Sequence, residues 1–232
     1  MRTVPPRSTV RRGMASRGLR FSACLCVAVA GLLAAPALSG AGFTIEEIAV
    51  DDPPGAAAFA FTPDELAAPV GQRVRWSRGV DGDARHSVTQ DDRLFQMPPF
   101  SGPNIDFMLR FSAGTFPYYC EIHGSPGRGM DGVVRVPPGV DTDPLGANFD
   151  VFWIFDDLRE TGERFDVRYR RQGTSKWKRW IRNSPLESAE FGLDNEPERA
   201  VLGRAYEFSV RSKDGDNPRR RSDWSPVLVV VP

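Results

Sequence analysis

The sequence predicts an all-β protein made of two sandwich domains that follow an N-terminal leader. Beyond the leader, the chain shows no long apolar pattern with helical periodicity. It shows instead short runs rich in Val, Phe, Tyr and Trp, separated by Gly and Pro, as in β-sandwiches. One Pro- and Gly-rich seam, residues 136–146, divides the 232-residue chain. Each side of the seam is long enough for a domain of about 100 residues.

The predicted domain boundaries follow from the leader and the seam. We expect a signal peptide over residues 1–41 and a first β domain over residues 42–137. A linker is expected over residues 138–145, where prolines, glycines and acids interrupt any periodic pattern. The second β domain is expected over residues 146–232.

The leader predicts export. It carries six arginines and no acid, an apolar run from Phe21 to Ala35, and small residues suited to cleavage up to Ala41. The apolar run is shorter than the about 20 residues that span a bilayer, so we expect no transmembrane segment after cleavage. An uncleaved anchor is the alternative. Arg11-Arg12 leaves the twin-arginine route open beside the general secretory route.

Charge excludes one class of partner. The whole chain has 30 basic and 30 acidic residues, and without the arginine-rich leader 24 basic residues face 30 acidic ones. Nucleic-acid binding needs a basic surface, so we expect no nucleic-acid partner. The acidic residues of the first half favour a basic protein partner through long-range attraction.

Four strands are expected in the first half. They are residues 72–76, 107–111, 115–120 and 132–136. A turn at Ala113-Gly114 returns the chain for the strand that ends at Cys120. Since His86 lies 34 residues before Cys120, tertiary structure must bring the two together.

The most informative feature is the placement of soft metal ligands. The chain has two histidines, His86 and His123, and one cysteine outside the leader, Cys120, with Met130 shortly after them. Two imidazoles, one thiolate and a weak axial thioether describe a blue-copper electron-transfer site. An unpaired thiol in an exported protein is exposed to oxidation, and metal coordination would hold it as a thiolate.

Other sites fit this residue set less well. Zinc accepts Cys and His but prefers a carboxylate to a thioether, so Met130 argues against zinc. Multicopper enzymes need further histidines, and none remain. No nucleophile-elbow motif accompanies either histidine. We therefore expect a protein that is not an enzyme.

The first half resembles a plastocyanin-like cupredoxin. The matching segments are residues 70–76, 86–88, 114–120, His123 and residues 129–134. The resemblance implies a Greek-key β-sandwich with one copper ion, held by His86, Cys120, His123 and Met130. It also implies one-electron transfer to a redox protein partner that the sequence does not identify.

The same resemblance implies roles for neighbouring residues. His123 is the partly exposed ligand through which electrons pass, and Tyr119 lies on a second, more remote path. Ser87 orients the site as a second-shell residue. Six residues separate His123 from Met130, against four in plant-type plastocyanins.

The second half shows clear alternation, which predicts a half-buried sheet. Phe165, Val167 and Tyr169 are expected to face the core and to alternate with Asp166, Arg168 and Arg170. The same pattern places Tyr206, Phe208 and Val210 inward. Trp153 is expected to fill the space between two sheets.

This half resembles a fibronectin type III (immunoglobulin-like) domain. The matching segments are residues 150–153, 165–171, Trp177, residues 206–212 and 222–226. The resemblance suggests that Trp224 stacks with Arg168, Arg170 and Arg211. The alternative is that these arginines form an ordinary solvated face. Such a domain would supply spacing, or contact with a protein or a surface.

Three functions remain open. The first is one-electron transfer outside the cytoplasmic membrane, in a secreted, cell-surface or periplasmic location. The second is a copper carrier or scavenger without a redox partner. The third is an extracellular interaction protein whose cupredoxin half is purely structural.

Overall fold

The computed structural model describes residues 45–51, 59–78, 84–100, 106–142, 148–154, 162–192 and 197–232. The expected leader, residues 1–41, lies outside them. The described residues contain sixteen strands and no helix, so the prediction of an all-β protein is confirmed. None of these residues belongs to a helix with the length and apolar character needed to cross a membrane.

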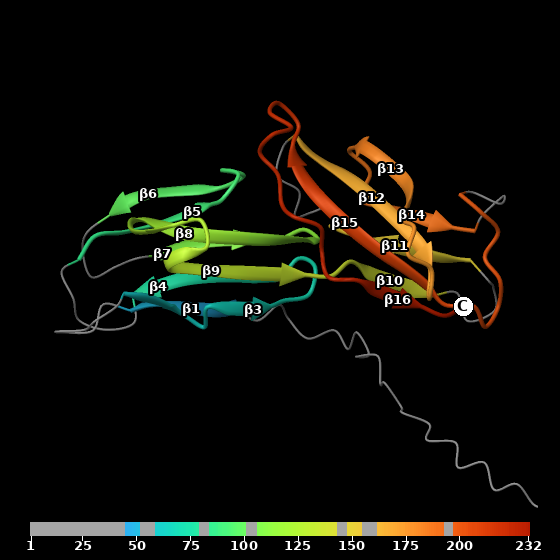
Figure 1. Cartoon of the computed structure of the whole chain (residues 1–232), viewed down its shortest axis with the longest axis horizontal. Coiled ribbons are helices and arrows are strands. Elements are labelled where there is room, and N and C mark those ends of the chain that lie inside the picture. Colours follow the sequence, from blue (N-terminus) through green and yellow to red (C-terminus); the bar gives the residue numbers. More distant parts are fainter. Residues whose placement is uncertain are drawn as a thin grey trace, which may run out of the picture. The chain divides into compact units, whose positions relative to one another are not determined.

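The first half folds as two sheets (Figure 1). A four-stranded sheet has the order β2-β1-β4-β7 and a five-stranded sheet the order β3-β9-β8-β5-β6. The strands are β1 (Ile45–Asp51), β2 (Ala60–Thr62), β3 (Glu65–Ala67), β4 (Arg73–Arg78), β5 (His86–Gln90), β6 (Gln96–Phe100), β7 (Asp106–Arg110), β8 (Gly114–Ser125) and β9 (Arg128–Val136).

Aromatic side chains hold these two sheets together. Trp76 of β4 meets Tyr118 of β8 edge-to-face, with ring centroids 5.3 Å apart. Phe61 of β2 meets the same tyrosine at 4.9 Å. All three side chains are buried, so the two sheets pack face to face as a sandwich.

The second half also folds as two sheets, with the orders β10-β11-β14 and β13-β12-β15-β16. All of their pairings are antiparallel. The strands are β10 (Gly139–Thr142), β11 (Phe149–Phe152), β12 (Glu163–Arg171), β13 (Lys178–Ser184), β14 (Ser188–Phe191), β15 (Tyr206–Asp214) and β16 (Leu228–Val230). Figure 1 shows the long strands β12 and β15 side by side.

The inward positions predicted in β12 and β15 are confirmed, but Asp166, Glu207 and Ser209 on the opposite face are buried as well. The inward residues, Phe165, Val167, Tyr169, Tyr206, Phe208 and Val210, are all buried. Trp153 is fully buried, and its indole N–H donates to the Leu186 carbonyl over 2.6 Å. The aromatic core of this sandwich therefore has the composition that the sequence pattern predicts.

The four strands expected in the first half correspond to β4, β7, β8 and β9, but β8 and β9 extend further. β8 continues past Cys120 to Ser125, and β9 starts as early as Arg128. Residues 139–142 of the expected linker form β10, which pairs with β11. The remaining linker residues, 143–145, lie outside the described part of the chain.

Residues Ala41–Pro232 form one compact unit. Within it, β8 of the first half forms hydrogen bonds with the second half. Thr115 at the start of β8 exchanges two main-chain hydrogen bonds with Asp223, of 3.2 and 2.8 Å. The Thr115 hydroxyl donates to the Trp224 carbonyl over 3.0 Å. The N–H of Ala113 donates to the Trp153 carbonyl over 2.8 Å. Strand β8 is thus hydrogen-bonded to residues of the second half.

Candidate metal centre

The centre is built where the pairing of β8 with β9 is interrupted. Tyr119 pairs with Asp131 and, after a register shift, Gly124 pairs with Gly129. The four residues Cys120–His123 therefore oppose only Met130 on β9. Such an excess of residues on one strand forms a bulge, and bulges re-aim side chains. Here the bulge contains both Cys120 and His123.

The segment between His123 and Met130 is a hairpin tip. Ser125 pairs with Arg128 across the turn at Pro126-Gly127. Gly127 has φ +67°, and a Pro-Gly pair with positive φ at the glycine suits a type II turn. Gly129 has φ +84°, and a Cβ there would lie 2.6 Å from the carbonyl oxygen of His123. The longer segment is thus accommodated as an ordered extension of the two strands.

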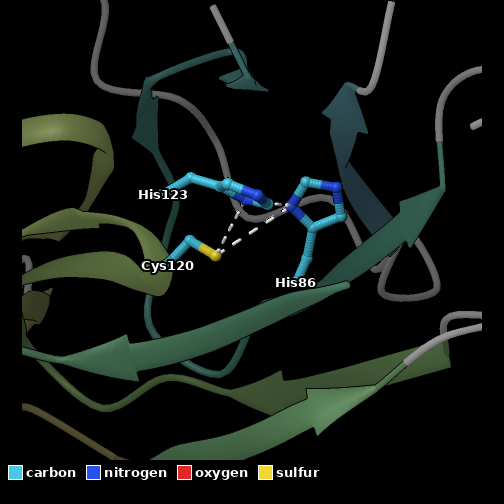
Figure 2. Close-up of side chains that lie close together, drawn as sticks. All are labelled: His86, Cys120 and His123. Carbon is cyan, nitrogen blue, oxygen red and sulfur yellow. Dashed lines mark hydrogen bonds between the residues drawn. The ribbon is translucent and has the colours of Figure 1, made fainter. Parts of the chain in front are cut away.

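Three donor atoms converge from β5 and β8, as Figure 2 shows. The Cys120 Sγ lies 3.9 Å from His86 Nδ1 and 3.6 Å from His123 Nδ1. The two Nδ1 atoms are 3.2 Å apart. We call these three residues the His–Cys–His cluster. Among the described residues, this cluster is the one group of side chains that could hold a metal ion. It contains no carboxylate.

The size of this triangle tests whether a metal ion fits. A point equidistant from the three atoms lies about 2.1 Å from each, within the about 2.0–2.3 Å that imidazole nitrogen and thiolate sulfur keep from a zinc ion. Imidazole nitrogen and thiolate sulfur are also ligands that copper accepts. The spacing of the three atoms therefore fits a first-row metal ion.

The three residues of the cluster differ in solvent exposure. His86 and Cys120 have no exposed surface, whereas His123 is half-buried. The ring of Phe59 stacks on the His123 ring, with centroids 3.9 Å apart, and meets the His86 ring at 5.5 Å. Sequence reasoning missed Phe59, because it lies among alanines without any motif. His123 is thus the member of the cluster nearest to solvent.

Ser87 lies against the sulfur of Cys120, and its role in orienting the site stays a prediction. Its backbone N–H donates to Cys120 Sγ over 3.4 Å, and its hydroxyl lies 4.0 Å from the same atom. The hydroxyl accepts a hydrogen bond of 2.7 Å from the Glu121 N–H. These hydrogen bonds hold the sulfur and the start of the bulge in place.

Met130 and Tyr119 take different positions around the cluster. Met130 is buried, with 1% of its surface exposed, and its register position faces the bulge that carries Cys120 and His123. Tyr119 precedes Cys120 on β8, is half-buried, and pairs with Thr89 and Asp131. The predicted axial and electron-path roles of these two residues remain predictions.

No protein-family model and no curated protein matches the chain. The chain is similar to solved structures of cupredoxins. One is a purple cupredoxin from Nitrosopumilus maritimus, 28% identical, covering 39% of this chain and 98% of that one at a TM-score of 0.33. Plastocyanin from Dryopteris crassirhizoma is 23% identical over the same shares, with a TM-score of 0.33. Amicyanin from Paracoccus versutus is 17% identical over 41% of this chain and 84% of that one, with a TM-score of 0.31.

Proposed function

We propose that this protein is an exported electron carrier with one copper ion, held by His86, Cys120 and His123, with Met130 as a weak fourth ligand. The observation that carries the proposal is the triangle of two Nδ1 atoms and one Sγ, whose centre lies at metal-bonding distance from all three. Zinc also accepts imidazole and thiolate donors, so the choice of copper over zinc rests on the thioether of Met130 as the fourth ligand.

Bound copper supplies reversible one-electron chemistry at this position. The protein's own residues do the rest. Ser87 donates a hydrogen bond to the sulfur, and β5 and β8 carry the two imidazoles and the cysteine that would hold the ion. Burial of Cys120 keeps oxidants from the sulfur. The half-buried His123, stacked on Phe59, is the proposed point of electron entry and exit.

The proposed partner is a basic redox protein. A groove of about 640 Å³ begins at Phe59 and Gly129, beside the cluster, and is lined by the carboxylates of Asp64, Asp91 and Asp131 among others. Burial, and then the charges of Asp223, Asp92 and Asp131, raise the pKa of Asp91, which marks a concentration of negative charge. Such a groove attracts a cationic surface and speeds its association.

The remaining parts of the proposal concern export and the second half. Export rests on the signal-peptide features of residues 1–41. A fibronectin type III-like second half is supported by its sheets of three and four antiparallel strands. Both histidines of the chain lie in the cluster, leaving none for a second copper centre or a histidine base, and we propose that the protein is not an enzyme.

The visible spectrum of the purified protein loaded with Cu(II) tests this function. We expect one copper per chain and an intense thiolate-to-copper charge-transfer band that vanishes on reduction and returns on oxidation. Cys120→Ser abolishes the band. Met130→Leu changes the reduction potential, whereas the matched control Met97→Leu, at the edge of the same sandwich, leaves it unchanged.

Two results would contradict the proposal. Failure to bind copper at one per chain would leave an interaction protein with a structural first half. Binding without the intense band, with rapid loss of copper to a mild chelator, would indicate a carrier or scavenger.

A further inference from the structure

A second site-like feature lies in the other half of the chain. A cavity of about 370 Å³ opens on strands β12, β13 and β15 and the segment that follows β15. It is lined by seven basic side chains, two tryptophans and one acid, Asp166. We call this surface the basic face. Its basic residues include Arg168, Arg179, Arg182, Arg211, Lys213 and Arg221.

Stacked arginines and tryptophans form the floor of the basic face. The Arg168 guanidinium lies over Trp177 at 4.4 Å and over Trp224 at 4.0 Å from the ring centroids. Arg170 covers Trp177 at 4.4 Å, and Arg211 covers Trp224 at 4.8 Å. The predicted arginine–tryptophan ladder is therefore present, with Trp177 as an additional rung. Each ring is contacted by two guanidinium groups. Arg170 also donates to Glu207 and Arg211 to Asp166, while other N–H groups of the ladder remain.

Two of those N–H groups are buried and lack a partner among the described residues. They are the Nε atoms of Arg168 and Arg211. A buried donor without an acceptor costs about 1–3 kcal/mol. Burial, and then the charges of Arg170 and Arg211, lower the pKa of Arg168, consistent with unbalanced positive charge. The ladder thus carries positive charge at Arg168 that no carboxylate of the described residues pairs with.

The basic face has more positive side chains than carboxylates to pair with them. Asp166 pairs with Arg211 at 2.7 Å and with Lys213 at 2.8 Å. Within the described part of the chain, no carboxylate pairs with Arg168, Arg179 or Arg182. Arg168 and Arg179 are moreover direct cross-strand partners. Like charges directly opposite each other destabilise a sheet, so an anion beside this pair would relieve their repulsion.

We propose that the basic face binds an anionic polysaccharide through its charged oxygens. Guanidinium groups match the geometry of sulfate, phosphate and carboxylate groups and bind them with two parallel hydrogen bonds. Beyond Arg168, Arg179 and Arg182, the exposed Arg219 extends the basic surface, whereas Arg220 pairs with Asp214 and Arg221 with Asp92, each at 3.6 Å. Basic groups spread over more than one cavity suit a polymer better than a single small anion.

Two other polyanions fit the basic face less well. Single-stranded nucleic acids bind through stacking of bases on aromatic rings. Here guanidinium groups cover the faces of both tryptophans. Membrane surfaces are bound with inserted apolar side chains. None of the described large apolar side chains that are exposed lines the cavity.

The test measures binding of the purified protein to dextran sulfate, uncharged dextran, single-stranded DNA and vesicles rich in phosphatidylglycerol. We expect binding to dextran sulfate, none to dextran, and an affinity that falls linearly on a log–log plot against salt. The double variant Arg179→Gln/Arg182→Gln, exposed positions on β13 outside the ladder, should weaken binding at least tenfold.

The matched control is Arg199→Gln/Arg204→Gln, which removes the same charge from exposed positions outside the cavity. It should change the affinity less than twofold, and thermal unfolding should show that both double variants are folded. An equal loss in the control would overturn the proposal, because net charge alone would then explain binding. Tighter binding to DNA or to vesicles than to dextran sulfate would overturn it in favour of that partner.

Discussion

Ser87 and Cys120, 33 residues apart in sequence, are joined by a hydrogen bond of 3.4 Å from the Ser87 backbone N–H to the cysteine sulfur. The Ser87 hydroxyl accepts a second hydrogen bond, of 2.7 Å, from the N–H of Glu121, the residue after the cysteine. One serine on β5 therefore fixes both the sulfur and the backbone of β8 where the bulge begins.

Replacing Ser87 with alanine should lower the free energy of unfolding of the metal-free protein by about 1–2 kcal/mol. The Glu121 N–H loses its acceptor, while the backbone bond to the sulfur remains. Denaturant unfolding measures the change. Ser188→Ala, at an exposed position on β14, is the control and should have little effect. Equal stability of the two variants would show that the hydroxyl does not fix β8.

Alanine at Gly129 should be far more disruptive than alanine at Gly127. Both glycines have positive φ, which costs a non-glycine residue about 1–2 kcal/mol. Only at Gly129 would the added Cβ also strike backbone, 2.6 Å from the His123 carbonyl oxygen; at Gly127 nothing lies within 4 Å. Denaturant unfolding and copper titration should both report a larger loss for Gly129→Ala. Similar losses in the two variants would contradict the tight fit.

Asp166 should contribute stability that disappears in acid. Burial alone would raise its pKa, but hydrogen bonds from Arg211, Lys213 and the Asn183 N–H lower it to about 2. The unfolded value is about 3.9, so the contribution is complete above about pH 4 and is lost as the pH falls through about 2. Its size is roughly 2 kcal/mol, at about 1.4 kcal/mol per pKa unit.

Asp166→Asn should therefore destabilise the protein at pH 7 and flatten the acid limb of the stability curve. Lys213 is 7% exposed and would lose its counter-charge, which adds to the loss. Urea unfolding between pH 2.5 and 7 measures both effects. The exposed Asp150→Asn is the control and should keep the original slope. An unchanged slope in Asp166→Asn would contradict the assigned pKa.

The arginine–tryptophan ladder should show pairwise coupling between neighbouring rungs only. A double-mutant cycle with Trp224→Leu and Arg211→Gln should give about 0.5–1 kcal/mol, because the guanidinium lies 4.8 Å from the ring centroid. The matched cycle of Trp177→Leu with Arg211→Gln should give a value near zero, since Arg168 and Trp224 separate these two rungs. Equal coupling in both cycles would show that the ladder acts as a general charge cluster.

The sequence identified the His–Cys–His cluster because its residue types are scarce in this chain and chemically distinctive. Phe59 escaped notice because stacking on His123 depends on tertiary position and not on a motif. Strand β6 escaped notice for a different reason. It contains Pro98 and Pro99, which argue against a strand, yet β6 lies at a sheet edge, where missing N–H donors are tolerated.

The arginine–tryptophan ladder could be predicted only in part. Alternation indicated that Arg168 and Arg170 lie on the face of β12 opposite the core. Only the path of the segment carrying Trp224 decided between a solvated face and a stacked one. That path depends on long-range pairing, such as the bond from Ser225 N–H to the Val210 carbonyl, which local sequence does not determine.

Strand β8 carries Cys120 towards one end and, five residues earlier, exchanges main-chain hydrogen bonds with Asp223. Separating the two halves would therefore remove main-chain hydrogen bonds from the strand that bears the cysteine, not merely a neighbouring module. It follows that the sulfur and the second sandwich should share one cooperative unfolding event, with amide hydrogens of β8 and β15 reporting the same free energy of opening. A chain cut at the seam would then be a damaged protein and not a minimal one.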